Sequence, residues 1–239
     1  MQQGKLYLIP SPLAPNSLDT IPLSVLNTIL TLNEWIVEDI KTAQKYIYYT
    51  AKFLNKKVLI DNIIFHTLNE HTQPNDITHF LDTAKVGGTI GLLSDAGCPA
   101  IADPGTNIIL LAHQLDIQVI PLVGPSSILL TIMASGLNSQ NFAFNGYLPI
   151  KNPQRQKTIK DLEKIALQFH QAQFFIETPY RNQALLTALL CTLKSNTLLT
   201  IASNLTDINQ NIKTQPVANW NKNIPSLNKI PTVFGIAIL

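Results

Sequence analysis

The chain has 239 residues, of which 46% are hydrophobic and only 13% are charged. This apolar content excludes a largely disordered chain, and the length suits one large domain or two domains of about 120 residues each. The formal net charge of +2 lacks the basic excess that is typical of a nucleic-acid-binding protein, although a local basic patch would still serve that purpose.

In the first half of the chain, short apolar runs alternate with helical patterns. The predicted strands are residues 5–10, 34–38, 57–61, 89–94 and 117–122. The predicted helices between them are residues 24–32, 42–54, 74–84 and 104–115. This alternation is typical of a parallel sheet with crossover helices.

The second half has a different pattern, in which strands and helices do not alternate regularly. Its predicted strands are residues 141–148, 173–177, 198–203, 212–217 and 232–239, and its predicted helices are residues 126–135, 154–168 and 180–193. We therefore predict an α/β protein with two domains, residues 1–121 and 122–239. The first has a parallel-type sheet and the second a mixed sheet.

Polar loops with unusual composition follow several predicted strands. They read SPLAPN, ED, SDAGCPAIADPG, VGPSS and ETPYR. In open α/β sheets, ligands bind outside the carboxyl ends of the strands, so these loops predict a ligand cleft between the two domains. The loop SDAGCPAIADPG is also long for a connection between a strand and a helix, which favours a functional role.

Several common sites are absent from the sequence. There is no glycine-rich dinucleotide fingerprint after the first strand, no P-loop, no nucleophile elbow and no HExxH zinc motif. The cysteines, Cys98 and Cys191, belong to no metal-binding motif. Pro10 ends the apolar run of the N-terminal segment, and prolines and glycines interrupt the apolar tract at residues 119–136. We expect a cytoplasmic protein without a bound metal or a membrane segment.

The loop SDAGCPAIADPG resembles the SDAGTP-x-I-x-DPG loop of the tetrapyrrole methylase superfamily, the class III S-adenosylmethionine-dependent methyltransferases. Six further segments resemble, in order, the branch of this superfamily that methylates a cytidine ribose 2′-hydroxyl in ribosomal RNA. They are GKLYLIPSPL, IVEDIK, FHTLNE, PLVGPSS, ASGLNSQNFAFNGYLP and FFIETPYR. The resemblance covers nearly the whole chain.

The resemblance implies that the cofactor is S-adenosylmethionine and that the protein is a homodimer. The cofactor-binding residues that it implies are Pro12, Ser94, Ala96, Gly97, Cys98, Ile101, Ser126, Ser127, Glu177, Leu205 and Thr232. RNA is the partner implied by the branch, although the net charge gives it weak support.

Methyl transfer to a hydroxyl group requires a group that accepts the hydroxyl proton. The predicted catalytic residues are Glu38, Asp39 and Asp95, because they lie at strand ends beside the expected cofactor loop. His66 and Glu70 are further candidates. The alternative for Glu38 and Asp39 is that they cap the helix that follows, since acidic groups favour helix N-termini.

Three segments depart from the branch. Residues 14–19 lack its glycine, Lys41 replaces its arginine, and residues 203–210 carry amides where the branch has charged side chains. These changes remove groups that transfer protons or attract phosphate. The sequence therefore leaves three functions open, namely methylation of RNA, methylation of a tetrapyrrole or other small acceptor, and cofactor binding without turnover.

The polar helix at residues 154–168 carries four basic residues, Arg155, Lys157, Lys160 and Lys164. They form either a stripe that faces RNA or an ordinary solvated face.

Overall fold

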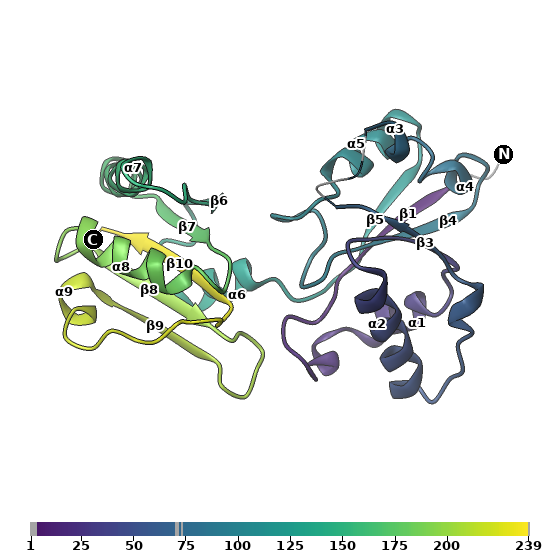
Figure 1. The fold of residues 1–239 in the computed structure, drawn as a ribbon, viewed down its shortest axis with the longest axis horizontal. Coiled ribbons are helices and arrows are strands. Elements are labelled where there is room, and N and C mark those ends of the chain that lie inside the picture. The colour runs from purple at the N-terminus through teal and green to yellow at the C-terminus, as the bar shows by residue number, and fades with distance from the viewer. Residues whose placement is uncertain (1–3, 70–71, 73, 239) are drawn as a thin grey trace. The chain divides into compact units, whose positions relative to one another are not determined.

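The computed structural model describes residues 4–69, 72 and 74–238. The chain divides into two compact units, residues 1–126 and residues 127–239, hereafter unit 1 and unit 2 (Figure 1). The division therefore lies a few residues after the boundary that the sequence predicts at residue 121. Each unit has its own sheet and its own apolar core.

Unit 1 is built on a five-stranded sheet in the order β3-β2-β4-β1-β5. The strands are β1 (Lys5–Ile9), β2 (Glu34–Val37), β3 (Ile64–Thr67), β4 (Thr89–Leu93) and β5 (Gln118–Pro121). All four pairings are parallel, as the alternation of strands and helices predicts. The carboxyl ends of the strands therefore share one edge of the sheet.

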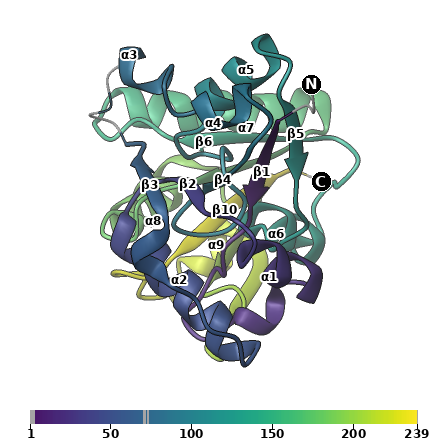
Figure 2. The same ribbon diagram turned by 90° about the vertical axis from the view of Figure 1, so that its right-hand side faces the viewer.

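Helices cover both faces of this sheet. They are α1 (Leu23–Ile29), α2 (Ile40–Phe53), α3 (Pro74–Ile77), α4 (Asp82–Lys85) and α5 (Thr106–Gln114), with 3-10 turns at Leu18–Thr20 and Ile60–Asn62. Helices α1 and α2 lie on one face, and α4 and α5 lie on the other (Figures 1 and 2). Along β2, Trp35 and Val37 pack with α1 and α2, whereas Ile36 packs with α4 and α5. This alternation is the two-residue period of a strand that is buried on both faces.

The third strand does not lie where the sequence predicts it. Residues 57–61 form a loop and the start of a 3-10 turn, and the side chain of Leu59 is 73% exposed. The strand is formed instead by Ile64–Thr67, which pairs with β2. The chain must cross from the helical layer back to the sheet after α2 ends at Phe53, and residues 54–63 are used for that crossing.

The single helix predicted at residues 74–84 is also wrong, because α3 and α4 are two short helices joined by tight turns. In the turns, the backbone N–H of His79 donates to Asp76, that of Phe80 to Ile77, and that of Asp82 to His79. These bonds span three residues instead of the four of an α-helix. Leu81, at the end of the turns, is fully buried in the core of unit 1.

Unit 2 has a five-stranded mixed sheet in the order β6-β7-β10-β8-β9, which confirms the predicted class. The strands are β6 (Phe142–Tyr147), β7 (Ala172–Ile176), β8 (Leu198–Ser203), β9 (Asn211–Pro216) and β10 (Thr232–Ala237). Strands β6 and β7 are parallel, and the other neighbours are antiparallel.

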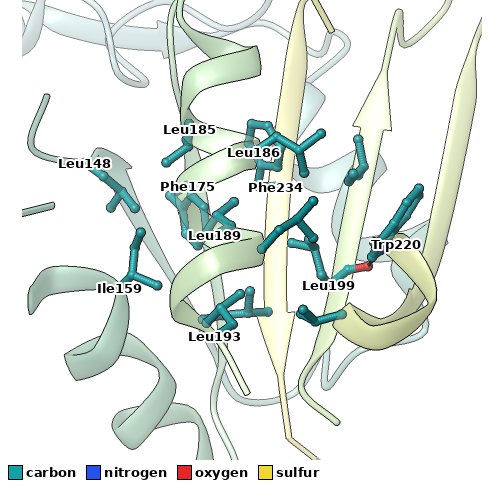
Figure 3. Close-up of a cluster of buried hydrophobic side chains, with 14 of the residues drawn as sticks. Leu148, Ile159, Phe175, Leu185, Leu186, Leu189, Leu193, Leu199, Trp220 and Phe234 are labelled. Atoms are coloured by element: carbon teal, nitrogen blue, oxygen red, sulfur yellow. Dashed lines mark hydrogen bonds between the residues drawn. The ribbon is translucent and has the colours of Figure 1, made fainter. Parts of the chain in front are cut away.

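The helices of unit 2 are α6 (Ser127–Ser135), α7 (Gln154–Phe169), α8 (Asn182–Thr192) and α9 (Val217–Trp220), of which α9 is not predicted from the sequence. The main core lies between the sheet and α7, α8 and α9 (Figure 3). There the rings of Phe175 and Phe234 stack at 6.1 Å, and the indole N–H of Trp220 donates to the carbonyl of Leu199. Ile132 of α6 packs on the opposite face.

Among the described residues, no helix combines the length and the apolar character that crossing a membrane requires.

Candidate active site

The loops that follow β1 and β4 are joined by a short backbone bridge. The N–H of Ser11 donates to the carbonyl of Gly97 at 2.9 Å, and the N–H of Gly97 donates to the carbonyl of Ser11 at 3.1 Å. The Ser11 hydroxyl also donates to the carbonyl of Ser94 at 3.0 Å. These bonds fix the start of the SDAGCPAIADPG loop at the carboxyl edge of the sheet.

Gly97 occupies a position in this bridge that only glycine adopts without strain. Its φ angle is +80°, in the left-handed region. A Cβ atom there would lie 3.0 Å from Cδ2 of Leu13 and 3.4 Å from the carbonyl oxygen of Pro125. The glycine thus lets three loops of unit 1 approach one another closely.

The thiol of Cys98 faces the loop that follows β5. Its Sγ lies 3.5 Å from the carbonyl oxygen of Pro125 and 3.9 Å from that of Gly124. Burial raises the pKa of the Cys98 thiol, so the group stays protonated and acts as a weak donor. Cys98 therefore helps to hold the SDAGCPAIADPG loop against the loop that follows β5.

Glu38 lies directly after β2, and its side chain is half-buried beside the same loop. Its Oε1 accepts a hydrogen bond from the backbone N–H of Asp95 at 3.3 Å. Burial and the nearby carboxylates of Asp103 and Asp95 raise the pKa of Glu38 to about 7, although the bond from Asp95 opposes them. A carboxyl group with such a pKa can accept or release a proton near neutral pH.

Two further carboxyl groups belong to the loop after β4. Burial raises the pKa of Asp95, and the charge of Asp39 adds to this effect. Burial also raises the pKa of Asp103, as does the charge of Asp95, while a hydrogen bond with the Ser94 hydroxyl opposes both. Asp103 was not predicted as a site residue, and the sequence signal that points to it is the second aspartate of the loop.

Asp39 has a different role from that of its neighbour Glu38. Its side chain accepts hydrogen bonds from the backbone N–H of Thr42 at 2.7 Å and from the Thr42 hydroxyl at 2.8 Å. These bonds cap the N-terminus of α2 and lower the pKa of Asp39. The helix-capping alternative thus holds for Asp39, whereas Glu38 faces Asp95.

A cavity of about 900 Å³ opens beside these loops within unit 1. Pro12, Ser94, Asp95 and Ala96 line it on the side of the loops. On the side of α2 it is lined by Thr42, Lys45, Tyr46, Tyr49, Lys52 and Phe53. Ligand pockets of small molecules have volumes of roughly 300–1,000 Å³ with a few placed polar groups, so this cavity fits a cofactor in size and lining.

Three of the expected cofactor residues, Pro12, Ser94 and Ala96, therefore line one cavity. Ile101 does not line it, and its side chain is 50% exposed. Ser126 is the last residue of unit 1, next to the loop that Cys98 contacts. The cofactor-binding role of all these residues stays a prediction.

In unit 2, Glu177 follows β7 and is buried in an ion-pair cluster. Its Oε1 accepts hydrogen bonds from Nη2 of Arg181 and from the N–H of Thr178, both at 2.7 Å. Nη2 of Arg155 lies 3.7 Å from its Oε2. Burial raises the pKa of Glu177, but the bonds from Arg181 and Thr178 outweigh it and the pKa is lowered.

Arg155 is itself buried, and its Nε donates a hydrogen bond to the carbonyl of Pro149 at 2.8 Å. The prediction that Arg155 belongs to an exposed stripe on α7 is therefore wrong. Lys157, Lys160 and Lys164 of the same helix are exposed.

The other expected cofactor residues of unit 2 lie near strand ends. Thr232 and Leu205 are buried, one at the start of β10 and the other shortly after β8. Thr232 pairs with Ser203 and its neighbour Val233 with Ile176, so the ends of β8 and β7 meet the start of β10 at one edge of this sheet. Ser127 begins α6. The cofactor-binding role of Ser127, Leu205 and Thr232 stays a prediction.

The histidine candidate, His66, contacts a different carboxylate, that of Glu34. His66 Nε2 is 2.8 Å from Oε1 of Glu34, and its ring stacks on Phe80. Glu34 begins β2, so it lies at the opposite end of the strand from Glu38. Glu70 lies outside the described residues. Within the described parts of the chain, no cluster of His, Cys, Asp and Glu side chains could hold a metal ion.

Comparison with known sequences identifies clear relatives. No protein-family model matches the chain. The chain is 29% identical over 215 residues to ribosomal RNA small subunit methyltransferase I of Vibrio cholerae, which covers 89% of this chain and 69% of the relative. It is 31% identical over 204 residues to the protein of the same name from Synechocystis, covering 85% of this chain and 67% of the relative.

Among solved structures, the fold is similar to that of uroporphyrin-III-C-methyltransferase from Thermus thermophilus. The TM-score is 0.54 with 15% identity, over 98% of this chain and 92% of the other. At this identity the likeness speaks for the fold alone. The sequence relatives carry the assignment further: the chain belongs to the family of the ribosomal RNA small subunit methyltransferase I proteins, within the tetrapyrrole methylase superfamily of S-adenosylmethionine-dependent methyltransferases.

Proposed function

We propose that this protein transfers a methyl group from S-adenosylmethionine to a ribose 2′-hydroxyl of small-subunit ribosomal RNA. The observation that carries the proposal is the position of Glu38, a half-buried carboxyl group with a pKa of about 7 beside the expected cofactor loop. The names of the curated relatives support ribosomal RNA as the acceptor.

The residues of unit 1 fit the cofactor. S-adenosylmethionine supplies a methyl group that is activated by its positively charged sulfur. Pro12, Ser94 and Ala96 would contact the cofactor in the cavity that they line, and Gly97 keeps their loop in the required shape. For the residues of unit 2, the proposal rests on the family resemblance.

Glu38 is proposed as the general base. As the ribose oxygen forms its bond to the methyl carbon and the bond from that carbon to sulfur breaks, the Glu38 carboxylate accepts the hydroxyl proton. Burial and the neighbouring carboxylates of Asp103 and Asp95 raise the pKa of Glu38 above that of an ordinary glutamate, which favours this transfer near neutral pH. Asp39 is occupied as the cap of α2, so it is proposed to position Glu38 and not to react itself.

The test is incorporation of tritium from labelled S-adenosylmethionine into small ribosomal subunits from a strain that lacks this modification. We expect incorporation by the wild-type protein, and alkali resistance of the labelled dinucleotide would place the methyl group on the ribose. The Glu38→Gln variant should bind the cofactor but transfer methyl groups at a strongly reduced rate.

Calorimetric titration with S-adenosylmethionine separates the remaining alternatives. Binding in the micromolar range, about −8 kcal/mol, together with background incorporation into RNA would refute the acceptor that we propose. Incorporation into a tetrapyrrole would then identify a small-molecule methyltransferase, and no incorporation into either acceptor would indicate binding without turnover. Absence of cofactor binding would refute the proposal as a whole.

A further inference from the structure

Helix α2 has one buried and one exposed stripe. Ala43, Ile47 and Ala51 recur every four residues and pack in the core of unit 1. The outward stripe consists of exposed lysines and aromatic residues, and we call it the α2 face. Its residues are Lys41, Lys45, Tyr48, Tyr49, Lys52 and Phe53. An amphipathic helix normally presents mixed charges to solvent, so a face of lysines and aromatic rings needs an explanation.

The aromatic side chains of the α2 face are far from buried. The exposed fractions are 53% for Tyr48, 51% for Tyr49 and 54% for Phe53. The rings of Tyr48 and Tyr49 lie edge to face with centroids 5.7 Å apart, and about half of each residue stays accessible to a ligand. Exposed rings of this kind are the platforms on which unpaired nucleic-acid bases stack.

The charge of this region has a single sign. Residues 40–60 contain five lysines, at positions 41, 45, 52, 56 and 57, and no aspartate or glutamate. Among the described residues, no ion pair within 4 Å engages Lys41, Lys45 or Lys52. Their positive charge is therefore available to a polyanion, and phosphate contacts of this kind supply most of the affinity for nucleic acids.

The α2 face leads to the candidate active site. Lys45 and Tyr49 line both the cavity of about 900 Å³ and a second depression of about 490 Å³ on the other side of the stripe. Asp95, whose N–H binds Glu38, lines the first of these cavities. A chain bound along the α2 face would thus reach the carboxylates without leaving unit 1.

We propose that the α2 face binds a single-stranded segment of the acceptor RNA, with phosphates at the lysines and bases stacked on Tyr48 and Tyr49. The proposal rests on the proposed function in taking RNA as the acceptor. A single strand fits better than a duplex, because stacking on the rings requires bases that are free of partners.

Fluorescence anisotropy with a labelled single-stranded oligouridine tests the proposal directly. Three lysine contacts predict a slope of about −2 in a plot of log affinity against log salt concentration. In the Lys45→Gln/Lys52→Gln variant, the slope of this plot should be less negative by about 1.4. The Tyr48→Ala and Tyr49→Ala variants should each weaken binding at least about fivefold with little change in the slope.

The exposed face of α7 offers matched controls in unit 2. Lys157→Gln/Lys160→Gln removes the same number of charges, and Phe169→Ala removes a ring that is 56% exposed. We expect both controls to bind the oligouridine with the wild-type affinity and slope. If they weaken binding as much as the α2 variants do, the attraction is unspecific and the proposal is wrong.

Parallel titration with S-adenosylmethionine separates this inference from the proposed function. Tyr48 does not line the larger cavity, so Tyr48→Ala should keep the wild-type cofactor affinity while RNA binding falls. Methyl transfer to RNA with unchanged binding in all α2 variants would refute the inference and leave the function intact. RNA binding through α2 without methyl transfer would refute the function and leave the inference intact.

Dissociation of a homodimer by Tyr48→Ala/Tyr49→Ala, with RNA affinity unchanged, would show that a second copy covers this face and would overturn the proposal.

Discussion

Glu38 takes its properties from the groups that surround it at the residue scale. Its side chain is half-buried after β2, the carboxylate of Asp103 repels its charge, and the N–H of Asp95 donates a hydrogen bond that opposes both effects. Near neutral pH, its protonated and ionised forms are therefore present in comparable amounts. A free glutamate, with a pKa of about 4.3, would be a much weaker base.

We predict that methyl transfer by the wild-type protein increases with pH through a midpoint near 7, because the ionised form of Glu38 is the one that accepts a proton. Loss of a general base lowers rates by about 10²- to 10⁴-fold, so Glu38→Gln should fall in this range and lose the midpoint. Rates measured across the pH range check this. A variant that kept both the rate and the midpoint would show that another group is the base.

The same pKa makes a prediction for stability. Because the pKa of Glu38 is raised from 4.5 to about 7 on folding, its contribution to stability is complete below pH 4.5 and is lost as the pH rises through about 7. Glu38→Gln removes this loss. Thermal unfolding should therefore show the variant gaining stability relative to the wild type as the pH rises across this interval, and a constant difference would contradict the raised pKa.

Gly97 is the subject of a third prediction at the residue scale. A β-branched residue at φ +80° is strained by about 1–3 kcal/mol, and its Cβ would press against Leu13. Gly97→Val should keep the fold of unit 1 but displace the loop that carries Ser94 and Ala96, so affinity for S-adenosylmethionine should fall at least about tenfold. Calorimetry and circular dichroism measure the two effects separately. Unchanged affinity would mean that the cofactor does not depend on this loop.

At the scale of elements, α2 joins structural and functional roles. Its first turn is fixed by Asp39, its buried stripe holds the core of unit 1, and Tyr46 donates a hydrogen bond to the carbonyl of Pro10 at 2.9 Å. Pro10 directly follows β1. The helix therefore supports the loop of Ser11 and Pro12 on one side and presents its lysines to solvent on the other.

We predict that Asp39→Ala lowers the melting temperature, because the N–H and hydroxyl of Thr42 both lose their acceptor. Asp39→Asn keeps an oxygen acceptor at the cap, so its melting temperature should stay close to that of the wild type. Differential scanning calorimetry of the two variants makes the comparison. Equal destabilisation by both would show that the charge of Asp39, and not the cap, is what stabilises α2.

At the scale of the whole molecule, each unit is stabilised by its own core. In unit 2, Phe234 is fully buried in the central strand β10 and stacks on Phe175. Phe234→Ala should destabilise unit 2 by about 3–5 kcal/mol, the usual range for removing a buried phenylalanine. Amide hydrogen exchange in β7, β8 and β10 would measure this loss. Exchange rates that stayed unchanged in these strands would contradict the predicted core.

Most of the fold could be predicted from the sequence, because short apolar runs between helical patterns specify parallel strands and crossover helices. The third strand could not, since residues 57–61 and 64–67 are both short apolar runs and only pairing with β2 decides between them. The break between α3 and α4 also depends on tertiary packing, because Leu81 must reach the core.

The candidate site could be predicted from the sequence where its residues lie at the ends of predicted strands. Glu38 is the last residue of the strand predicted at residues 34–38, and Asp95 directly follows the strand predicted at residues 89–94. The two neighbouring parallel strands bring these residues together. Asp103 was missed because its distance to Glu38 depends on the path of the loop, in which Ala100 and Ala102 have positive φ angles. Arg155 was misplaced because a basic residue on a polar helix gives no sign of a buried acidic partner such as Glu177.

The lysines of residues 41–57 have a practical consequence for handling the protein. A formal net charge of +2 would suggest weak retention on a cation exchanger, but retention depends on the local patch that meets the resin. Purified preparations should bind heparin and carry along cellular nucleic acid until the salt concentration is raised. An absorbance ratio at 260 and 280 nm should therefore be checked before any affinity is measured, since bound RNA would occupy the very surface under study.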